Sequence, residues 1–567
     1  MSTTAMPVYE WKTLPWKTIE RNVFKLQKRI YQASQRGDVK TVHRLQRLLM
    51  KSWSAKHLAV RRVTQDNQGK KTAGVDGVKS LTPPQRTRLA EVLGLQPKAR
   101  PVRRVWIPKP GTQEKRGLGI PAMYDRASQA LAKLALEPEW EARFEENSYG
   151  FRPGRSCHDA IEAIFNSIRY KAKYVLDADI SKCFDQISHQ ALLQKLATFP
   201  KMRRNIKAWL EAGVMEGLEL SATTKGTPQG GPLSPLLANV ALHGLEEAIT
   251  TASPPRKQRE AWTPTVIRYA DDFVVLHADL EVIQEIRDMV AAWLAGMGLE
   301  LSPKKTSITH TLQEYEGKTG FDFLGFTVRQ FPVGKNRTGR NTKNKPLGFK
   351  TIIRPSDTKV KEHLQEIGRV IQHHQGATQA HLIGKLTPKM KGWAQYYSTV
   401  VSSKCVETLD HLVWVKLRSW ALRRHPKKPV KWTIGKYWRR EQGTWDFAVK
   451  DGAGLYSYGQ TPIKRHVKVR SSKSVFDGDW LYWASRTGAH PEIPKSVAML
   501  LKKQKGKCAR CGLVLTTEDI WENDHIVPVI SGGADDMKNR QLLHRHCHDS
   551  KTREDGSLLG GGTHDKS

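Results

Sequence analysis

The chain has 567 residues, more than a single hydrophobic core supports, so we expect about three or four domains. Lys and Arg number 93 against 55 Asp and Glu, and this formal charge of +38 indicates a polyanionic partner. The sequence has no apolar run near the roughly eighteen residues that a membrane span needs. It also lacks an apolar signal-peptide core at the start. These features predict a cytoplasmic protein that works on nucleic acid and not on a membrane.

The N-terminal region has the pattern of basic helices. Residues 17–58 carry apolar side chains at helical spacing on either side of a break at Gly37-Asp38, which predicts two helices. The apolar stripe indicates packing against a core. The other side, with Arg44, Arg47 and Lys51, either grips RNA or faces solvent.

A hairpin is predicted next. Two short strands, residues 102–107 and 118–120, flank a Pro-Gly turn. The hairpin carries Lys109 and Arg116, which could face a triphosphate because Arg offers a bidentate fork and Lys a point charge.

A turn-rich basic loop, residues 148–156, precedes a helix that opens near His158. Arg152 and Arg155 lie in this loop. Such a loop suits backbone phosphates near a helix N-terminus.

Two acidic segments predict a metal site. Residues 174–180 have the composition of a strand, and the period of two puts Asp177 and Asp179 on the same face. Asp271 and Asp272 stand between the apolar runs 265–267 and 273–276, a pattern typical of a hairpin with two carboxylates at its tip. Neighbouring carboxylates repel one another, and a divalent cation would offset their charge. An ordinary Asp-Asp turn is the alternative.

A glycine-rich loop, residues 226–231, contains Gln229 and lies between the two acidic segments. The order of strand aspartate, glycine-rich loop and Asp-Asp hairpin favours a phosphoryl-transfer site with two magnesium ions.

At this point the sequence resembles the reverse transcriptases encoded by bacterial group II introns. The segments that carry the resemblance are residues 106–110, 118–121, 148–155, 179–185, 227–230, 269–272, 302–306 and 323–325.

The resemblance implies roles for individual residues. Asp179, Asp271 and Asp272 would form the polymerase triad that binds Mg²⁺. The implied nucleotide-binding residues are Lys109, Arg116, Phe184 and Gln229, and residues 323–326 would lie near the primer end. Phe184 matches the steric gate of the family, whose ring would collide with a ribose 2′-hydroxyl; a core aromatic is the alternative.

The region after the polymerase motifs is basic and then helical. Residues 334–350 read as a flexible link or as an arm that orders on RNA. Residues 356–424 predict three helices, with one helix start at Thr387-Pro388. The resemblance makes this region the thumb, or domain X, with maturase function. Arg423 and Arg424 would contact phosphates.

A second constellation lies in the last 70 residues. Cys508 and Cys511 are matched by His544 and Cys547, two ligand pairs at knuckle spacing that could hold zinc in a tetrahedral site. His546 is a poor substitute for His544 because the two-residue gap is lost.

This constellation resembles an HNH endonuclease. His525 would be the general base that activates water, and Asp524 and His548 would hold one magnesium ion at the scissile phosphate. Asn539 would orient the loop. The alternative is a structural zinc knuckle that grips DNA, and the Asp-His pair between the ligand pairs opposes it.

We therefore expect a multi-domain α+β protein with right-hand polymerase fingers and palm, an α-helical thumb and a small zinc-binding ββα HNH domain. The predicted divisions are a basic helical extension with the start of the fingers (residues 1–95), fingers and palm (96–335), thumb (336–440), a DNA-binding region (441–495) and the HNH domain (496–567).

The expected function is RNA-directed DNA polymerase, maturase and DNA endonuclease, supporting intron splicing and retrohoming by target-primed reverse transcription. The partners would be group II intron RNA, target DNA and deoxynucleoside triphosphates, in a ribonucleoprotein with one or two protein copies. One rival is an RNA-dependent RNA polymerase, which Phe184 opposes. The other is a splicing-only maturase that binds RNA, which the intact Asp179, Asp271 and Asp272 oppose.

Overall fold

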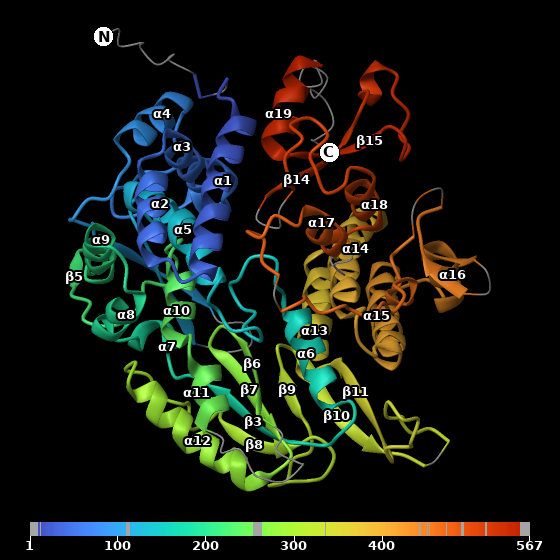
Figure 1. The fold of residues 1–567 in the computed structure, drawn as a ribbon. Coiled ribbons are helices and arrows are strands. Elements are labelled where there is room, and N and C mark those ends of the chain that lie inside the picture. Colours follow the sequence, from blue (N-terminus) through green and yellow to red (C-terminus); the bar gives the residue numbers. More distant parts are fainter. Residues whose placement is uncertain are drawn as a thin grey trace.

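The structure is a computed structural model. It describes residues 10–11, 13–108, 114–252, 263–334, 336–441, 444–450, 452, 454–471, 473–488, 493–515 and 519–555. Lys109 lies outside the described residues. The expected mixed architecture of helices and sheets is confirmed. Figure 1 shows the N-terminal helices and the C-terminal domain side by side at one end, with the central sheet at the other.

Residues 16–61, all of which are described, form three helices where the sequence predicts two. They are α1 (Trp16–Gln35), α2 (Val39–Lys51) and α3 (Trp53–Arg61). The expected second helix divides at Ser52, whose backbone is extended and whose hydroxyl accepts a hydrogen bond from the amide of Ala55. A serine side chain that competes for backbone groups starts a new helix at this point. Short helical turns, η1 (Arg62–Asp66) and η2 (Gln68–Lys71), and α4 (Pro83–Val92) follow.

The predicted hairpin is part of a larger sheet with the strand order β2-β1-β4-β5. Its strands are β1 (Val102–Pro108), β2 (Lys115–Ile120), β4 (Val214–Glu216) and β5 (Glu219–Ser221).

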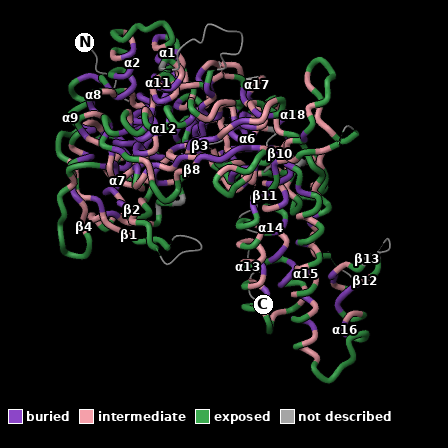
Figure 2. The backbone as a smooth tube through the Cα atoms, turned by 90° about the horizontal axis from the view of Figure 1, so that it is seen from below, coloured by how far each residue is buried: buried purple, intermediate pink, exposed green. Residues whose placement is uncertain are grey.

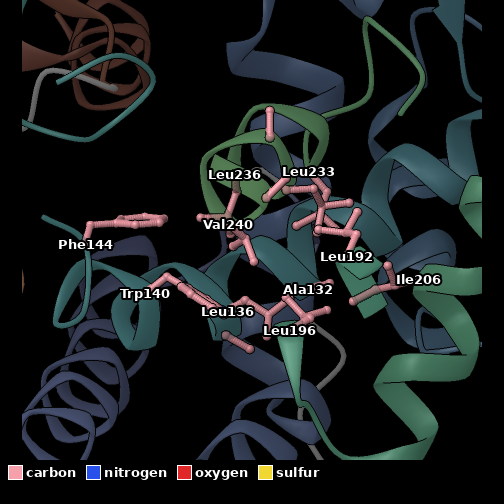
Figure 3. Close-up of a cluster of buried hydrophobic side chains, with 14 of the residues drawn as sticks. Ala132, Leu136, Trp140, Phe144, Leu192, Leu196, Ile206, Leu233, Leu236 and Val240 are labelled. Carbon is pink, nitrogen blue, oxygen red and sulfur yellow. The ribbon is translucent and has the colours of Figure 1, made fainter. Parts of the chain in front are cut away.

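The centre of the largest core is α5 (Met123–Glu141), which is buried on nearly every side. Figure 3 shows its residues Ala132, Leu136 and Trp140 packed against apolar side chains of three later helices. These helices are α8 (His189–Leu196), α9 (Pro200–Leu210) and α10 (Ser234–Leu242). This shared core joins the fingers to the palm.

The predicted acidic strand and hairpin lie in one antiparallel sheet with the order β6-β7-β3-β8. Its strands are β3 (Tyr174–Asp179), β6 (Thr265–Tyr269), β7 (Asp272–His277) and β8 (Ser307–His310). The helices around it are α6 (Cys157–Ile168), α7 (Cys183–Gln186), α11 (Leu245–Ala252) and α12 (Leu280–Ala295). The register sets Asp179 opposite Asp272.

A further sheet, β11-β10-β9, follows the palm. Its strands are β9 (Phe321–Phe323), β10 (Phe326–Pro332) and β11 (Phe349–Pro355). The segment expected to be a flexible link or an arm is the connection of the β10–β11 hairpin, and a bridge between Arg340 and Pro346 closes it. The predicted boundary at 335/336 falls inside this hairpin.

The thumb region contains the three predicted helices within residues 357–424, all described: α13 (Asp357–His373), α14 (Gln379–Tyr397) and α15 (Ser403–Arg424). Figure 2 shows them running side by side away from the rest of the chain. The predicted start at Thr387-Pro388 is wrong. Pro388 lies inside α14, which begins after Thr378. Pro388 lacks the amide N–H that would complete the helical hydrogen-bond ladder, and the helix nevertheless continues past it to Tyr397.

The chain continues through α16 (Val430–Tyr437), the hairpin β12 (Trp438–Glu441) and β13 (Thr444–Phe447), η3 (Tyr458–Gln460), α17 (Trp480–Gly488) and α18 (Lys495–Lys503). The C-terminal domain has the expected ββα order: β14 (Trp521–His525), the turn η4 (Val529–Ser531), β15 (Arg540–His544) and α19 (Arg545–Glu554).

Within the described part of the chain, the helices are too short or too polar to cross a lipid bilayer.

Candidate active site and metal centre

Three carboxylates converge at one end of the palm sheet. Asp179 ends β3, Asp272 begins β7 directly opposite it, and Asp271 occupies the turn before β7. Burial raises the pKa of Asp271, and burial together with the charge of Asp271 raises the pKa of Asp272 to about 7. A divalent cation would remove this repulsion, and carboxylate oxygens are the ligands that Mg²⁺ prefers. The three residues therefore fit a magnesium site.

A lysine that the sequence analysis gave no role lies beside these carboxylates. Nζ of Lys305 is 3.0 Å from Oδ2 of Asp179. The loop that carries Lys305 is held there by the amide of Ser302, which donates to the carbonyl of Asp179 at 2.8 Å. The motif at residues 302–306 was recognised, but its proximity to Asp179 depends on a loop pairing that the sequence does not reveal.

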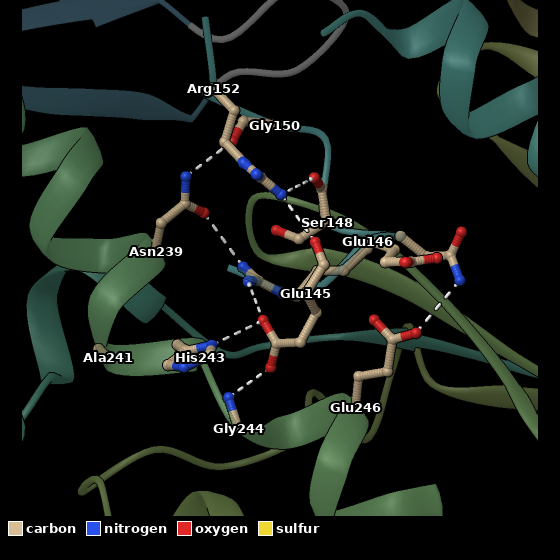
Figure 4. Close-up of polar contacts among 12 residues, drawn as sticks. Glu145, Glu146, Ser148, Gly150, Arg152, Asn239, Ala241, His243, Gly244 and Glu246 are labelled. Carbon is tan, nitrogen blue, oxygen red and sulfur yellow. Dashed lines mark hydrogen bonds and ion pairs between the residues drawn. The ribbon is translucent and has the colours of Figure 1, made fainter. Parts of the chain in front are cut away.

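The turn that carries Asp271 is supported from behind by a buried polar network, drawn in Figure 4. Nη1 of the fully buried Arg268 donates to the carbonyl of Ala270 at 3.2 Å and to Oδ1 of Asn239 at 3.1 Å. Nδ2 of Asn239 in turn donates to the carbonyl of Gly150 at 2.8 Å. Ala270 has φ +60°, a strained value for a residue with a side chain, so the hydrogen bond to its carbonyl helps to hold the turn.

The same network contains a buried acid. Oε2 of Glu145 lies 3.0 Å from Nδ1 of His243 and 3.8 Å from Nη2 of Arg268. Burial alone would raise the pKa of Glu145, but the hydrogen bond with His243 and the charge of Arg268 lower it to about 2. Glu145 is therefore an anion that offsets the buried charge of Arg268.

Gly150 allows the basic loop to contact the turn that carries Asp271. A Cβ atom on Gly150 would lie 2.2 Å from the amide nitrogen of Ala270, which no side chain permits. The amide of Tyr149 also donates to the carbonyl of Arg268 at 2.9 Å. The loop and the turn are therefore in direct backbone contact.

The expectation that Arg152 contacts phosphates is wrong. Its side chain is 1% exposed and forms a bidentate pair with Glu141 at 2.9 and 3.1 Å, and it also donates to two backbone carbonyls. A guanidinium whose donors are used in the interior cannot reach a ligand. Arg155 is half-buried, donates to the carbonyl of Glu146 at 2.9 Å, and has a pKa that burial lowers to about 10.

The predicted nucleotide-binding residues come from three segments that touch one another. Phe184 is half-buried in α7, and its carbonyl accepts from the amide of Thr227 at 2.6 Å. The carbonyl of Gln229 accepts from the amide of Gly119 in β2 at 2.7 Å. Arg116 is exposed on β2, and its charge offsets part of the rise that burial causes in the pKa of Asp271.

Phe151 is a candidate that the sequence analysis missed. Its ring is 48% exposed and meets the ring of Phe184 edge to face, with 6.0 Å between the centroids. Its φ is +58°, in the left-handed region that residues with a side chain rarely adopt. An exposed aromatic next to the expected sugar position suits contact with a nucleotide.

Arg423 and Arg424 lie at the end of α15 and differ in environment. Arg424 is half-buried over the ring of Trp420 at 4.6 Å and donates to the carbonyl of Ala377 at 2.8 Å. Arg423 is exposed and has the more available charge for a phosphate.

The four expected zinc ligands cluster. One ligand atom each from Cys508, Cys511, His544 and Cys547 lies within 4.8 Å of the others, and all four residues are buried. Nδ1 of His544 faces Sγ of Cys511 at 3.3 Å, while its Nε2 lies 3.3 Å from the carbonyl of Val514 and 3.6 Å from Oδ2 of Asp519. A carboxylate on the second ring nitrogen is the usual support of a metal-binding histidine, so the residues fit zinc. Asp519 could not be predicted from the ligand spacing in the sequence.

The expected nuclease residues lie on the β14–β15 hairpin and α19. Asp524 is 3.8 Å from Nε2 of His548, and Nε2 of His525 is 3.2 Å from Oδ1 of Asp535. Lys551 also reaches Asp524, at 3.2 Å. Asn539 makes hydrogen bonds with the amide and the carbonyl of Val527, both at 2.9 Å, and thereby braces the loop.

Comparison with known proteins gives four family matches along the chain. Residues 11–93 match the N-terminal domain of reverse transcriptase, and residues 107–328 match reverse transcriptase (RNA-dependent DNA polymerase). Residues 360–438 match the group II intron maturase-specific domain, and residues 508–554 match HNH endonuclease. This chain belongs to the group II intron reverse transcriptase/maturase family, in the form that carries an HNH domain.

Relatives of this family member include the group II intron-encoded protein LtrA of Lactococcus lactis subsp. cremoris, which is 30% identical over 323 residues. That alignment covers 47% of this chain and 53% of LtrA, so the chain spans about half the length of this relative. Protein YkfC of Escherichia coli (strain K12) is 32% identical over 50% of this chain and 82% of its own length.

The family matches cover the parts of this reverse transcriptase/maturase that hold its candidate sites. The palm carboxylates and Lys305 fall within residues 107–328, and the zinc cluster falls within residues 508–554. Residues 439–507 lie outside these four matches.

Proposed function

We propose that this chain is an RNA-directed DNA polymerase that also acts as an RNA-splicing maturase and as a DNA endonuclease. The observation that supports the polymerase function is the convergence of Asp179, Asp271 and Asp272. The loop with Gln229 is hydrogen-bonded to β2. It would work in the cytoplasm as a ribonucleoprotein with its intron RNA. The fingers, palm, thumb, DNA-binding region and nuclease would be divided broadly as the sequence predicted.

In the polymerase, Asp179, Asp271 and Asp272 would hold Mg²⁺. Bound Mg²⁺ supplies positive charge that activates the primer 3′-hydroxyl and stabilises the leaving pyrophosphate. Lys109 and Arg116 would hold the triphosphate of the incoming deoxynucleotide, and Gln229 would lie beside it. Phe184 would exclude a 2′-hydroxyl, and this opposes a function as an RNA-dependent RNA polymerase.

In the nuclease, His525 would take a proton from the attacking water, and Asp524 with His548 would hold one Mg²⁺. Cys508, Cys511, His544 and Cys547 would hold a structural Zn²⁺, supported by Asp519. The thumb, with Arg423 at the end of α15, would bind the intron RNA through phosphates and so assist splicing. The nick would then provide the 3′ end that the polymerase extends.

Primer extension on an RNA template tests the polymerase. Asp271→Asn keeps the shape of the side chain and removes a metal-binding charge, so cDNA synthesis should fall by roughly a thousandfold or more while splicing assistance persists. Asp177→Asn, the same change at a neighbouring carboxylate, is the matched control and should retain activity. Extension by Asp271→Asn at a near wild-type rate would refute the two-metal site.

A further inference from the structure

The C-terminal domain is in contact with the N-terminal helices through a polar cluster centred on the buried side chain of Arg61. The cluster consists of Arg61 of α3, Glu20 of α1, Asp66 of η1 and His546 of α19. Figure 1 shows α19 beside α1, although more than 480 residues separate Arg61 from His546.

Arg61 is the centre of this cluster. Its side chain is 4% exposed, and it lies 3.3 Å from Asp66 and 3.8 Å from Glu20. A guanidinium N–H donates to Nδ1 of His546, and the guanidinium stacks on the ring of Trp16 at 4.6 Å. A buried arginine with two acidic partners needs this partner set to remain complete, because removing one partner leaves an uncompensated charge.

His546 connects this contact to the zinc cluster. It stands between two of the expected zinc ligands, His544 and Cys547. His544 ends β15 and Cys547 lies on α19, so the segment that would hold zinc also positions His546 for the contact with Arg61.

The helix geometry separates the docking contact from the nuclease residues. His546 and His548 are two positions apart on α19, which at 3.6 residues per turn is a rotation of about 200°. His548 faces Asp524, 3.8 Å away, whereas His546 faces Arg61. The domain is thus held by one side while the proposed nuclease residues point to the other.

We propose that α1 and α3 form the docking site of the C-terminal domain, and that the Arg61–His546 contact fixes where the nuclease cuts relative to the polymerase. The second half of this statement rests on the proposed nuclease function. A nuclease domain docked in one position reaches one phosphate of a target held by the rest of the protein. A loosened nuclease reaches several neighbouring phosphates.

Hydrogen exchange of the full chain tests the proposed docking site directly. Arg61→Met keeps the apolar stem over Trp16 and removes the charge, and His546→Ala removes the acceptor without removing a zinc ligand. Each variant should speed amide exchange in α3 and in β15–α19 by about tenfold or more. The double variant should add little to either single change, because the two residues share one contact.

The matched control is Arg44→Met, the same substitution at an exposed position of α2. Its exchange should equal that of the unmodified protein. Unchanged exchange in Arg61→Met and His546→Ala would overturn the proposed docking site. Loss of zinc from His546→Ala would overturn it too, because His546 would then act as a ligand and not as the docking residue.

Mapping of the nicked phosphate in a target duplex tests the consequence. With the RNA-bound protein, both variants should keep total nicking within about twofold while the cut spreads from one phosphate to its neighbours. An unchanged single position would refute the positional role. If the unmodified protein does not nick DNA, the proposed nuclease function is wrong. Hydrogen exchange still decides whether the docking site exists.

Discussion

Nζ of Lys305 lies 3.0 Å from Oδ2 of Asp179, so a cation already stands next to a carboxylate that is expected to bind metal. The hydrogen bond to Asp179 raises the pKa of Lys305, which keeps the side chain charged. Bound Mg²⁺ would compensate the charge of Asp179, and Lys305 would then be available to contact the substrate phosphates.

Lys305→Met should therefore slow nucleotide addition. The loss of a charged group near the reacting phosphates should lower kcat by about 10- to 100-fold and change the KM for the primer less. Single-turnover primer extension measures the effect. Lys304→Met removes the exposed neighbouring lysine and should behave like the unmodified protein. Equal rates for the two variants would mean that Lys305 has no part in the reaction.

Arg268→Met should weaken the metal site without touching it. The carbonyl of Ala270 and the buried Glu145 would each lose a partner, so the free energy of unfolding of the palm should fall by about 3–5 kcal/mol. The Mg²⁺ concentration for half-maximal primer extension should rise by about tenfold. A fall in stability with an unchanged Mg²⁺ requirement would limit Arg268 to a structural role.

Phe184→Val should change the choice of sugar. A smaller side chain opens space at the 2′ position, so the ratio of kcat/KM for ribonucleotides to that for deoxynucleotides should rise by at least about tenfold. Phe151→Leu, which alters the ring in contact with Phe184, is an informative comparison because it leaves the proposed gate itself in place. An unchanged ratio in Phe184→Val would make Phe184 a packing residue.

The C-terminal domain should separate catalysis from folding. His525→Ala removes the proposed base, so nicking should be lost while zinc content and DNA binding persist. Cys508→Ser removes a ligand from a small domain whose folding depends on zinc, so the region from α18 onwards should become protease-sensitive. Primer extension should survive both changes. Retained nicking in His525→Ala would refute the general base.

Asp177 makes the stability of the palm depend on pH. Burial, with added repulsion from Asp179 and Asp322, raises its pKa from 3.8 to about 7. Because this folded pKa is raised, Asp177 destabilises the palm increasingly as the pH rises from 3.8 towards about 7. In EDTA, Asp177→Asn should raise the unfolding temperature more at pH 8 than at pH 5. Asp288→Asn, an exposed change on α12, should show no such difference.

The elements that could be predicted from the sequence are those with a strong local pattern. The alternation in residues 174–179 predicts β3, and the apolar runs around Asp271 predict the β6–β7 hairpin. The register of β3 with β7 then sets Asp179 opposite Asp272. The ligand spacing of the C-terminal domain gave the cluster of Cys508, Cys511, His544 and Cys547.

The residues that could not be predicted depend on long-range partners. Arg152 sits in a turn-rich basic loop, a local pattern typical of an exposed phosphate contact, but its partner Glu141 ends the preceding helix and takes it into the core. Asp519 and Lys305 likewise acquire their roles from contacts across loops. Thr387-Pro388 is typical of a helix start because proline is common there, whereas in the structure α14 runs through Pro388 from Gln379 to Tyr397.

The contact between Gly150 and Ala270 limits how this palm can be re-engineered. A transplanted hairpin of residues 265–277 would carry its aspartates but not their geometry, because the surface behind the turn is made by a segment more than a hundred residues earlier. A minimal transferable unit has to include residues 145–152, Asn239 and the hairpin together. A chain divided between these segments should regain its active geometry only when both pieces reassemble.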